Sequence, residues 1–309
     1  MEINILGAGA FGSALATAFA QNKNNKITLV ALPHSIEEIK SNQNRYAPDF
    51  KLLDNIEVST TFCAHPEVIF LATPAQKIAE IVETLKHRHP PIHPKVPFIF
   101  CSKGLYAENQ KPYLMTTYAQ QYLEHPLHVL AGPDFAHELL ALKKSFANIA
   151  GPKAQELCQA LTQDHFVLEP WHDVIGLQIC GCLKNVFAIA FGHAEGLQKG
   201  FNEKAALFTQ AFKEMNILAE AFWPHTFDPL TFMTYGGVGD LVLTCTSVNS
   251  RNFQLGQALA SGKTFENYKK ETKILAEGAL TAKVLHEVKG DLVMPYCDKV
   301  YDLLYSSNR

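Results

Sequence analysis

The chain has 309 residues, of which 47% are apolar and 18% are charged, and its formal net charge is -3. This length exceeds the size at which one hydrophobic core usually stops growing, so two domains are expected. The small net charge gives no long-range field that would attract DNA, RNA or an anionic membrane. A local group of cations must therefore hold any anionic ligand, and we expect no nucleic-acid partner.

The N-terminal residues and the cysteines predict a cytoplasmic protein. Residues 1–4 lack the basic and apolar regions of a secretion signal, and no run of about 18 apolar residues suggests a membrane span. The seven cysteines are odd in number and scattered, which favours reduced thiols. Cys180 and Cys182 would point in different directions on a helix, so we expect no metal site there.

Short apolar runs alternate with helical patterns in the first half of the chain. The runs predict strands at residues 3–6, 26–31, 68–72, 97–101 and 128–131. Helices are predicted at residues 13–20, 78–86 and 111–122. This alternation is typical of an α/β fold, and it predicts a Rossmann-type doubly wound parallel sheet.

The second half of the chain is helical in pattern. Apolar periodicity predicts helices at residues 174–194, 204–221, 252–260, 281–287 and 295–305. We therefore expect a dinucleotide-binding domain at residues 1–172 and an all-α substrate-binding domain at residues 173–309. Ligands of doubly wound sheets bind beyond the carboxyl ends of the strands, which makes Lys103, Gly132 and Asp134 candidate site residues.

A glycine turn follows the first predicted strand and opens the first predicted helix. Gly7 can make the tight turn, Gly9 lets the backbone approach a pyrophosphate, and Gly12 allows close packing of the helix. The N–H groups of Ala10 and Phe11 would lie at the helix N-terminus, where anions bind. The turn predicts that NAD or NADP is the cofactor.

The loop after the second strand leaves the choice between NAD and NADP open. An acidic residue is expected there to bind the ribose hydroxyls of NAD, yet residues 30–34 contain neither Asp nor Glu. Arginine is absent from the same stretch, so only His34 and Ser35 are near enough in sequence to contact a 2'-phosphate.

Lys184 occurs in a predicted helix that is apolar on almost every side. Burial disfavours an ammonium group, which is how an enzyme obtains a lysine that donates and accepts a proton near neutral pH. A lysine that extends to the surface at a domain boundary, or that pairs with a carboxylate, is the structural alternative.

Three further charged residues are candidates for the same site. Lys103 ends the strand at residues 97–101, although a lysine in a loop is also common on protein surfaces. Asp240 follows a cluster of glycines, and Arg251 begins a predicted helix, where a guanidinium suits a phosphate.

Seven segments together resemble the NAD(P)-dependent glycerol-3-phosphate dehydrogenase family of the bacterial type, over nearly the whole chain. The segments are residues 7–12, 102–105, 131–136, 183–186, 237–246, 250–252 and 276–278. Gly-Asp-Leu at 239–241 followed by Ser-Arg-Asn at 250–252 is far more specific than the glycine turn.

The resemblance implies reversible reduction of dihydroxyacetone phosphate to sn-glycerol 3-phosphate, which feeds glycerophospholipid synthesis, in a homodimer. It makes Lys184 the proton donor and acceptor, with Lys103 and Asp240 as catalytic partners. The implied substrate contacts are Lys103, Gly132, Asp134, Lys184, Asp240, Ser250, Arg251 and Asn252. The implied cofactor contacts outside the glycine turn are His34, Lys103, Ala136, Arg251, Leu275 and Glu277. No metal is implied.

Two departures from the family pattern keep rival functions open. The family usually has Ser or Thr where this chain has Asp134, and it commonly reads Thr-Arg-Gly where this chain has residues 209–211, Thr-Gln-Ala. A 3-hydroxyacid or ketopantoate-type dehydrogenase shares the architecture but would bind a carboxylate instead of a phosphate. A diverged, inactive dinucleotide-binding paralogue is the alternative outside enzymes.

Overall fold

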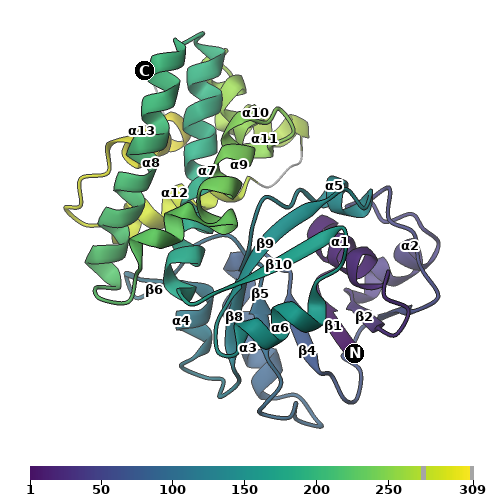
Figure 1. Cartoon of the computed structure of the whole chain (residues 1–309). Coiled ribbons are helices and arrows are strands. Elements are labelled where there is room, and N and C mark those ends of the chain that lie inside the picture. Colours follow the sequence, from purple (N-terminus) through teal and green to yellow (C-terminus); the bar gives the residue numbers. More distant parts are fainter. Residues whose placement is uncertain (273–275, 307–309) are drawn as a thin grey trace. The chain divides into compact units, whose positions relative to one another are not determined.

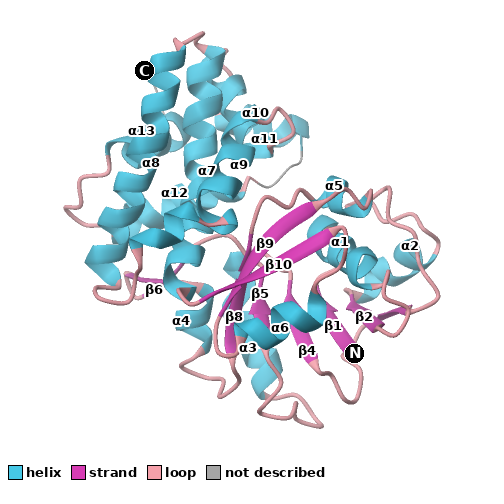
Figure 2. Ribbon diagram, viewed as in Figure 1, coloured by secondary structure: helices cyan, strands magenta, loops and turns pink. Residues whose placement is uncertain are grey.

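A computed structural model of the chain describes residues 1–272 and 276–306. The chain divides into two compact units (Figure 1). The sheet unit comprises Met1–Ser102 and Met115–Val174, and the helical unit comprises Lys103–Leu114 and Ile175–Arg309. Figure 2 shows the main sheet in the sheet unit, whereas the described residues of the helical unit form one two-stranded hairpin.

The sheet unit is built on an eight-stranded sheet with the order β10-β9-β8-β5-β4-β1-β2-β3. The strands are β1 (Glu2–Leu6), β2 (Lys26–Val30), β3 (Ile56–Ser59), β4 (Val68–Leu71), β5 (Phe98–Phe100), β8 (Leu127–Ala131), β9 (Ser145–Ala150) and β10 (Phe166–Trp171). Every pairing within it is parallel except β8 with β9. The prediction of a Rossmann-type sheet is confirmed.

Helices lie between most consecutive strands of the sheet. They are α1 (Ala10–Phe19), α2 (Ile36–Lys40), α3 (Ile78–Lys86), α4 (Met115–Ala119), α5 (Ala136–Leu140) and α6 (Ala154–Leu161), with 3-10 turns at Pro33–Ser35 and Ala75–Lys77. From β1 the chain first moves to β2 and later returns through β4 to β5 on the other side. Because crossovers are right-handed, this reversal places α1 and α3 on opposite faces of the sheet.

The core of the sheet unit forms where α1 meets the sheet. Phe19 at the end of α1 has its ring centroid 5.0 Å from that of Phe70 on β4 and 6.0 Å from that of Phe166 on β10. All three rings are inaccessible to solvent. Their burial fixes α1 on the sheet, and α1 carries the glycine turn at its start.

The helical unit contains the remaining long helices. They are α7 (Val174–Gly196), α8 (Phe201–Phe222), α9 (Asp240–Thr246), α10 (Arg251–Ala260), α11 (Phe265–Thr272), α12 (Glu277–Val288) and α13 (Pro295–Tyr305). A 3-10 turn (Pro229–Met233) and a π-helical turn (Tyr235–Gly239) precede α9. The predicted helices at 174–194, 204–221, 252–260, 281–287 and 295–305 match α7, α8, α10, α12 and α13.

Helix α7 is long and apolar enough to cross a membrane, judged by length and composition alone. However, 89% of its most apolar 18-residue window is buried inside the fold. Its side chains pack with α8 and α12 residues in the core of the helical unit. This is the environment of the central helix of a domain core.

A carboxylate from α8 caps the start of α13. Glu214 is fully buried, and its two carboxylate oxygens accept hydrogen bonds from the backbone N–H groups of Tyr296 and Cys297, each at 3.0 Å. The side chain of Gln210, one turn earlier on α8, also donates to Glu214 at 3.3 Å. Gln210 thus helps to hold this buried carboxylate, which gives a physical role to one of the departures from the family pattern.

The predicted helix at residues 111–122 is wrong in its first part. Residues 111–113 form strand β7 (Lys111–Tyr113), which pairs with β6 (Tyr106–Glu108), and the helix that follows is only α4. The turn residues Asn109 and Gln110 have φ of 52° and 60°, the left-handed pair that a two-residue hairpin requires.

This hairpin belongs to the helical unit although the surrounding sequence belongs to the sheet unit. Leu105 and Leu114, at its two ends, are inaccessible to solvent in the core of the helical unit. Both hairpin strands contact α12. The sequence predicted a single boundary between residues 172 and 173, and the compact units differ from it by this inserted segment.

Candidate active site

The glycine turn has the geometry of a dinucleotide-binding turn. Gly7 has φ of +110°, and a Cβ there would lie 2.5 Å from the Ala72 carbonyl oxygen at the end of β4. A Cβ on Gly12 would lie 1.8 Å from the Gly7 carbonyl oxygen. Both positions therefore require glycine for reasons internal to the fold.

Gly9 differs from the other two glycines because nothing in the fold requires it. Its φ is -74°, and a Cβ there would meet no heavy atom within 4 Å among the described residues. Gly9 is the N-cap residue of α1 and, because it has no side chain, it forms no capping hydrogen bond. An open approach to an uncapped helix N-terminus fits a bound pyrophosphate.

The position of the turn in the sheet also fits a dinucleotide. The turn follows β1, which lies between β2 and β4, so the direction of strand succession reverses at β1. The carboxyl ends of strands at such a reversal form the usual ligand site of doubly wound sheets. Residues Gly7, Gly9, Ala10, Phe11 and Gly12 all lie there.

Asn44 supports the turn, and it was not among the predicted site residues. Its side-chain amide donates to the carbonyl oxygen of Ala8 at 3.1 Å and to the hydroxyl of Ser13 at 2.9 Å. Asn44 is 3% exposed and lies 36 residues from Ala8 in sequence. No local motif marks such a contact, which forms only when the segment after α2 folds back onto α1.

The loop after β2 carries His34 in an exposed 3-10 turn. Glu38, one turn later in α2, forms an ion pair with Arg45. The hydrogen bond from Arg45 lowers the pKa of Glu38. Arg45 is thus a cation of this segment that is already paired with a carboxylate.

Gly132 and Asp134 follow β8, as predicted, and Ala136 begins α5. A Cβ on Gly132 would lie 2.3 Å from the Phe146 carbonyl oxygen and 2.5 Å from the Ala147 Cα on β9. Close packing of the backbone against β9 therefore accounts for Gly132. Asp134 is 5% exposed.

In the helical unit, one carboxylate binds both predicted lysines. Asp240 Oδ2 lies 3.2 Å from Lys103 Nζ, and Asp240 Oδ1 accepts a hydrogen bond from Lys184 Nζ. The Lys184 side chain is 6% exposed and the Asp240 side chain 1%. Lys184 is therefore a buried lysine paired with a carboxylate, which was the structural alternative, and the group of three contains all the predicted catalytic residues.

Each member of this cluster is held by a different element. Lys184 lies in the middle of α7, Asp240 begins α9 after the π-helical turn, and Lys103 begins the segment that carries the β6-β7 hairpin. Thr244, one turn after Asp240, donates its hydroxyl to the Asp240 backbone carbonyl at 2.7 Å and lies 3.4 Å from Oδ1. A Cβ on Gly181 would be 3.6 Å from Lys103 Cγ, so the lysine stem lies along α7.

Glu277 interacts electrostatically with Arg251 and with the two lysines of this cluster. Burial raises the pKa of Glu277, whereas the positive charges of Arg251, Lys103 and Lys184 oppose this rise. Three cations thus act on one carboxyl group, with Asp240 as the second carboxylate between the lysines. The three cations exceed the two carboxylates by one, which suits a substrate that carries a negative charge.

The side chains of Ser250 and Asn252 both form hydrogen bonds within the helical unit. Ser250 is the N-cap of α10, and its hydroxyl accepts a hydrogen bond from the Phe253 N–H at 3.3 Å. The Asn252 side chain bonds to Asn185 and to the Gly278 N–H. The predicted cofactor contact Leu275 lies outside the described residues.

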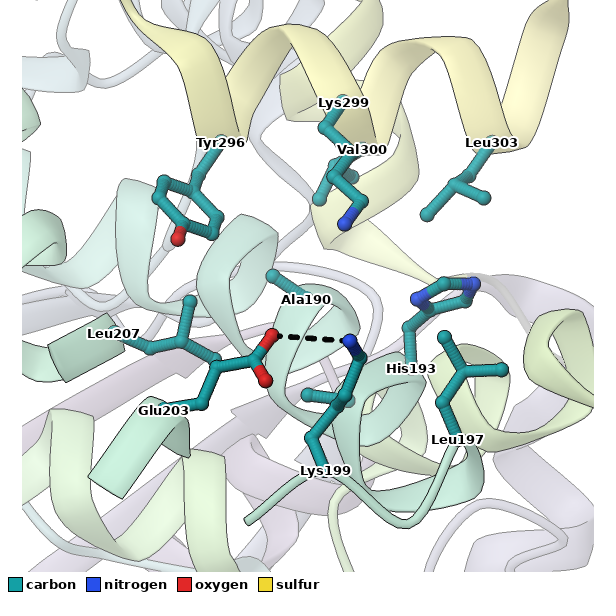
Figure 3. A pocket seen from close by; sticks show the side chains of 11 residues that line it. Ala190, His193, Leu197, Lys199, Glu203, Leu207, Tyr296, Lys299, Val300 and Leu303 are labelled. Carbon is teal, nitrogen blue, oxygen red and sulfur yellow. Dashed lines mark ion pairs between the residues drawn. The ribbon is translucent and has the colours of Figure 1, made fainter. Parts of the chain in front are cut away.

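A separate hollow of about 20 Å³ lies between α7, α8 and α13 (Figure 3). His193, Tyr296 and Lys299 line it, together with an ion pair between Lys199 and Glu203 at 3.4 Å. None of the clustered lysines and carboxylates described above lines this hollow. Its volume suits water molecules rather than an organic substrate.

Family models match both parts of the chain. The model described as NAD-dependent glycerol-3-phosphate dehydrogenase N-terminus matches residues 2–157, and the model described as its C-terminus matches residues 173–309. The glycine turn falls within the first match, and Lys184, Asp240 and Arg251 fall within the second.

Relatives share about a third of the sequence over its full length. Glycerol-3-phosphate dehydrogenase [NAD(P)+] of Bacillus subtilis is 32% identical over 100% of this chain and 91% of its own. The enzyme of the same name from a Wolbachia of Culex pipiens is 34% identical over 99% of this chain and 96% of its own. The crystal structure of glycerol-3-phosphate dehydrogenase from Coxiella burnetii has a TM-score of 0.90 at 29% identity, covering 99% of this chain and 95% of that one.

Dehydrogenases of the rival type are more distant. A probable 2-dehydropantoate 2-reductase from Bacillus subtilis has a TM-score of 0.55 at 12% identity, which shows a shared fold alone. The matches to both family models and the full-length relatives agree with the glycine turn and with the charged cluster. The chain belongs to the NAD-dependent glycerol-3-phosphate dehydrogenase family and is an oxidoreductase that uses NAD or NADP.

Proposed function

We propose that this chain catalyses the reversible reduction of dihydroxyacetone phosphate to sn-glycerol 3-phosphate, with Lys184, Asp240 and Lys103 as its catalytic group. The observation that supports this most directly is the buried Asp240 carboxylate shared by two lysines. Such a group supplies a proton donor, an orienting acceptor and a second positive charge within one hydrogen-bonded unit.

The residues of the sheet unit fit the cofactor. Gly9 leaves open space at the uncapped start of α1, and Gly7 and Gly12 shape the turn around it. When bound there, NADH or NADPH supplies the hydride that the carbonyl carbon accepts. The backbone N–H groups at the start of α1 would hold the pyrophosphate.

The side chains of the helical unit act on the carbonyl oxygen. Hydride addition to the ketone carbon makes the oxygen an alkoxide, and Lys184 donates a proton to it. Asp240 holds the Lys184 ammonium in position through its hydrogen bond and keeps Lys103 near it. Lys103 stabilises the negative charge that develops before the proton arrives. In the reverse direction Lys184 accepts the proton.

Arg251 is proposed to bind the substrate phosphate. It begins α10 directly after the N-cap Ser250, and its charge acts on Glu277 together with the charges of the two lysines. A guanidinium can bind two phosphate oxygens at once, which orients the substrate as well as holding it. We assign Glu277 to the cofactor side of this group.

The composition and the family resemblance also support a proposal about where the chain acts and how its product is used. We propose that the chain acts in the cytoplasm as a homodimer, where sn-glycerol 3-phosphate feeds glycerophospholipid synthesis. This proposal rests on the family resemblance, on the balanced charge of the chain and on its free cysteines.

A direct assay tests the function. The purified protein is mixed with NADH or NADPH and dihydroxyacetone phosphate, and the decrease in absorbance of the reduced cofactor is followed. Turnover with at least one cofactor is expected, and the ratio of the two rates gives the cofactor preference. Faster turnover of ketopantoate would favour the rival dehydrogenase. Cofactor binding without oxidation of either cofactor by any of these ketones would favour the inactive paralogue.

A further inference from the structure

The small hollow between α7, α8 and α13 is lined by polar side chains that the fold does not use. His193 on α7 and both Tyr296 and Lys299 on α13 line it. Among the described residues, none forms a hydrogen bond or an ion pair with these three side chains. His193 and Tyr296 are partly exposed and Lys299 is exposed, so a ligand from solvent can reach all three.

The hollow carries an excess of positive charge. Lys199 and Glu203 also line it, but they form an ion pair at 3.4 Å, so their charges largely cancel. Lys299 has no such carboxylate among the described residues, and its side chain extends from α13 into the hollow (Figure 3). Burial, followed by the positive charges of Lys299 and Lys199, lowers the pKa of His193. The charges of both lysines therefore act on the imidazole.

The three unused side chains offer hydrogen-bond donors to an anion. The ammonium of Lys299 has only donors, and the hydroxyl of Tyr296 and the imidazole of His193 can each donate one hydrogen bond. Apolar side chains, among them Leu207 and Val300, form the walls between these groups. Attraction between a cation and an anion is stronger beside such walls than in open water.

The volume of the hollow limits the ligand to a single small ion. About 20 Å³ is room for roughly one water molecule. A monatomic anion such as chloride is only slightly larger than water, whereas phosphate has several heavy atoms and needs more room. Water also fits, but the positive charge of the lining favours an anion over a neutral molecule.

We propose that a monatomic anion such as chloride binds in this hollow, where Lys299, Tyr296 and His193 hold it. The ion contacts α7 and α13 at once, so it neutralises Lys299 and joins the two helices. Its effect is on the stability of the helical unit, because none of the proposed catalytic residues lines the hollow. The inference is therefore independent of the proposed function.

The test compares thermal unfolding in chloride and in gluconate at constant ionic strength, since gluconate is too large for the hollow. Chloride at about ten times its Kd should raise the Tm of the wild type by about 2 to 4 °C, because it binds the folded state alone. Lys299→Ala should lose this rise. In gluconate the two proteins should unfold at nearly the same temperature, because Lys299 then has no partner to lose. Lys283→Ala, which removes an exposed lysine from α12, should keep the wild-type response.

A second variant and a second measurement cover the case in which Lys299→Ala does not fold. Tyr296→Phe removes one donor and keeps the ring, so the Kd for chloride should rise roughly 10-fold. Bromide can replace chloride in crystals of the full-length wild type, where its anomalous scattering locates the ion. A bromide peak is expected in the hollow, within hydrogen-bond distance of Lys299 Nζ.

The pH dependence of chloride binding tests the contact with His193. A bound anion favours the imidazolium, so binding takes up a proton and the affinity should increase as the pH falls from 8 to 6, by at most about 10-fold per pH unit. The other charged or titratable groups that line the hollow are Lys199, Glu203, Tyr296 and Lys299. His193→Gln should remove most of this pH dependence, and an unchanged dependence would contradict the contact.

The remaining outcomes decide whether the site exists. If chloride raises the Tm of the wild type and of Lys299→Ala equally, the effect is a general salt effect and the proposed site is wrong. The absence of a bromide peak from the hollow, at a bromide concentration that gives the full rise in Tm, also overturns it. A rise that requires Lys299, together with a bromide peak beside its ammonium, supports the site.

Discussion

The sheet unit and the helical unit contribute to the proposed site through different features, one through its backbone and the other through its side chains. In the sheet unit the important positions are glycines, where the absence of a side chain shapes a turn and leaves the start of α1 open. In the helical unit the important positions are charged side chains that are removed from solvent and paired with one another. Backbone geometry therefore shapes the proposed cofactor site, and charged side chains supply the groups for the proposed proton transfer.

Because of this difference, substitutions in the two units should impair different properties of the protein. A substitution in the glycine turn should affect folding or cofactor binding, because the backbone itself would bind the cofactor. A change in the charged cluster should affect turnover while the cofactor still binds. Three experiments test this separation, and a fourth concerns the stability of the sheet unit at acid pH.

The largest effect is expected for Lys184→Ala, which removes the proposed proton donor. The value of kcat should decrease by about 1,000-fold, within the range found for general acid catalysis, while the dissociation constant of NADH stays nearly constant. Asp240 keeps Lys103 as a partner, so the fold should survive. Lys199→Ala removes a lysine of the same unit whose side chain is 42% exposed, and it serves as the control. Loss of NADH binding in Lys184→Ala would contradict the separation.

The next effect concerns two glycines of the same turn. Gly12→Ala places a Cβ 1.8 Å from the Gly7 carbonyl oxygen, so the turn must shift. We expect a loss of about 1 to 3 kcal/mol in the free energy of unfolding, typical of overpacking. Gly9→Ala meets open space and should fold normally but bind NADH more weakly. Thermal unfolding and NADH fluorescence titration measure both effects, and equal unfolding temperatures for the two variants would contradict this distinction.

An effect of similar size is expected for Arg251→Ala. Losing a charge-assisted hydrogen bond to phosphate costs about 1.5 to 3 kcal/mol, which corresponds to roughly 10- to 100-fold in KM for dihydroxyacetone phosphate. Arg251→Lys should recover part of this loss because it keeps the charge without the two-pronged geometry. Steady-state kinetics with varied ketone measures the effect. An unchanged KM would remove Arg251 from the phosphate site.

The smallest effect concerns stability at acid pH and involves the sheet unit. Burial lowers the pKa of His128, whose Nε2 lies 2.6 Å from the Pro152 carbonyl oxygen. The unfolded chain therefore takes up a proton below about pH 6.5 that the folded chain resists, and stability decreases as pH falls through this range. The slope is at most about 1.4 kcal/mol per pH unit for one proton.

Urea unfolding of the wild type and of His128→Gln between pH 7.5 and 5 measures this slope. The variant should be less stable at every pH but should lose stability less steeply as the pH falls. His65→Gln, which changes an exposed histidine, should keep the wild-type slope. Equal slopes in the wild type and in His128→Gln would remove His128 as the cause.

The sequence predicted the parts of the fold that depend on local pattern. Short, mainly apolar runs indicated β1, β2, β4, β5 and β8, and the glycine spacing indicated the turn. Strands β3, β9 and β10 were not predicted, and their sequences carry Glu57, Asn148 and Pro170 within otherwise mainly apolar patterns. The hairpin at residues 106–113 was missed because its Asn-Gln turn has no glycine to mark it.

The candidate site was predictable as a set of residues but not as an arrangement. The family resemblance singled out Lys103, Lys184 and Asp240, yet their hydrogen bonds join residues 137 and 56 positions apart. Asn44 and Asn185 received no role, because an asparagine with a distant partner has no local pattern. Such contacts follow from tertiary folding, which a single sequence does not display.

The inserted segment Lys103–Leu114 has a consequence for recombining this protein with its relatives. Because Leu105 and Leu114 anchor the segment in the core of the helical unit, the C-terminal half of the chain is not a separable module. A chimera that exchanges only residues 175–309 would place a foreign hairpin in that core and a foreign lysine beside Asp240. A chimera that also carries residues 103–114 keeps its hydrophobic contacts and its lysine pair from a single parent, so the natural exchange unit is discontinuous in sequence.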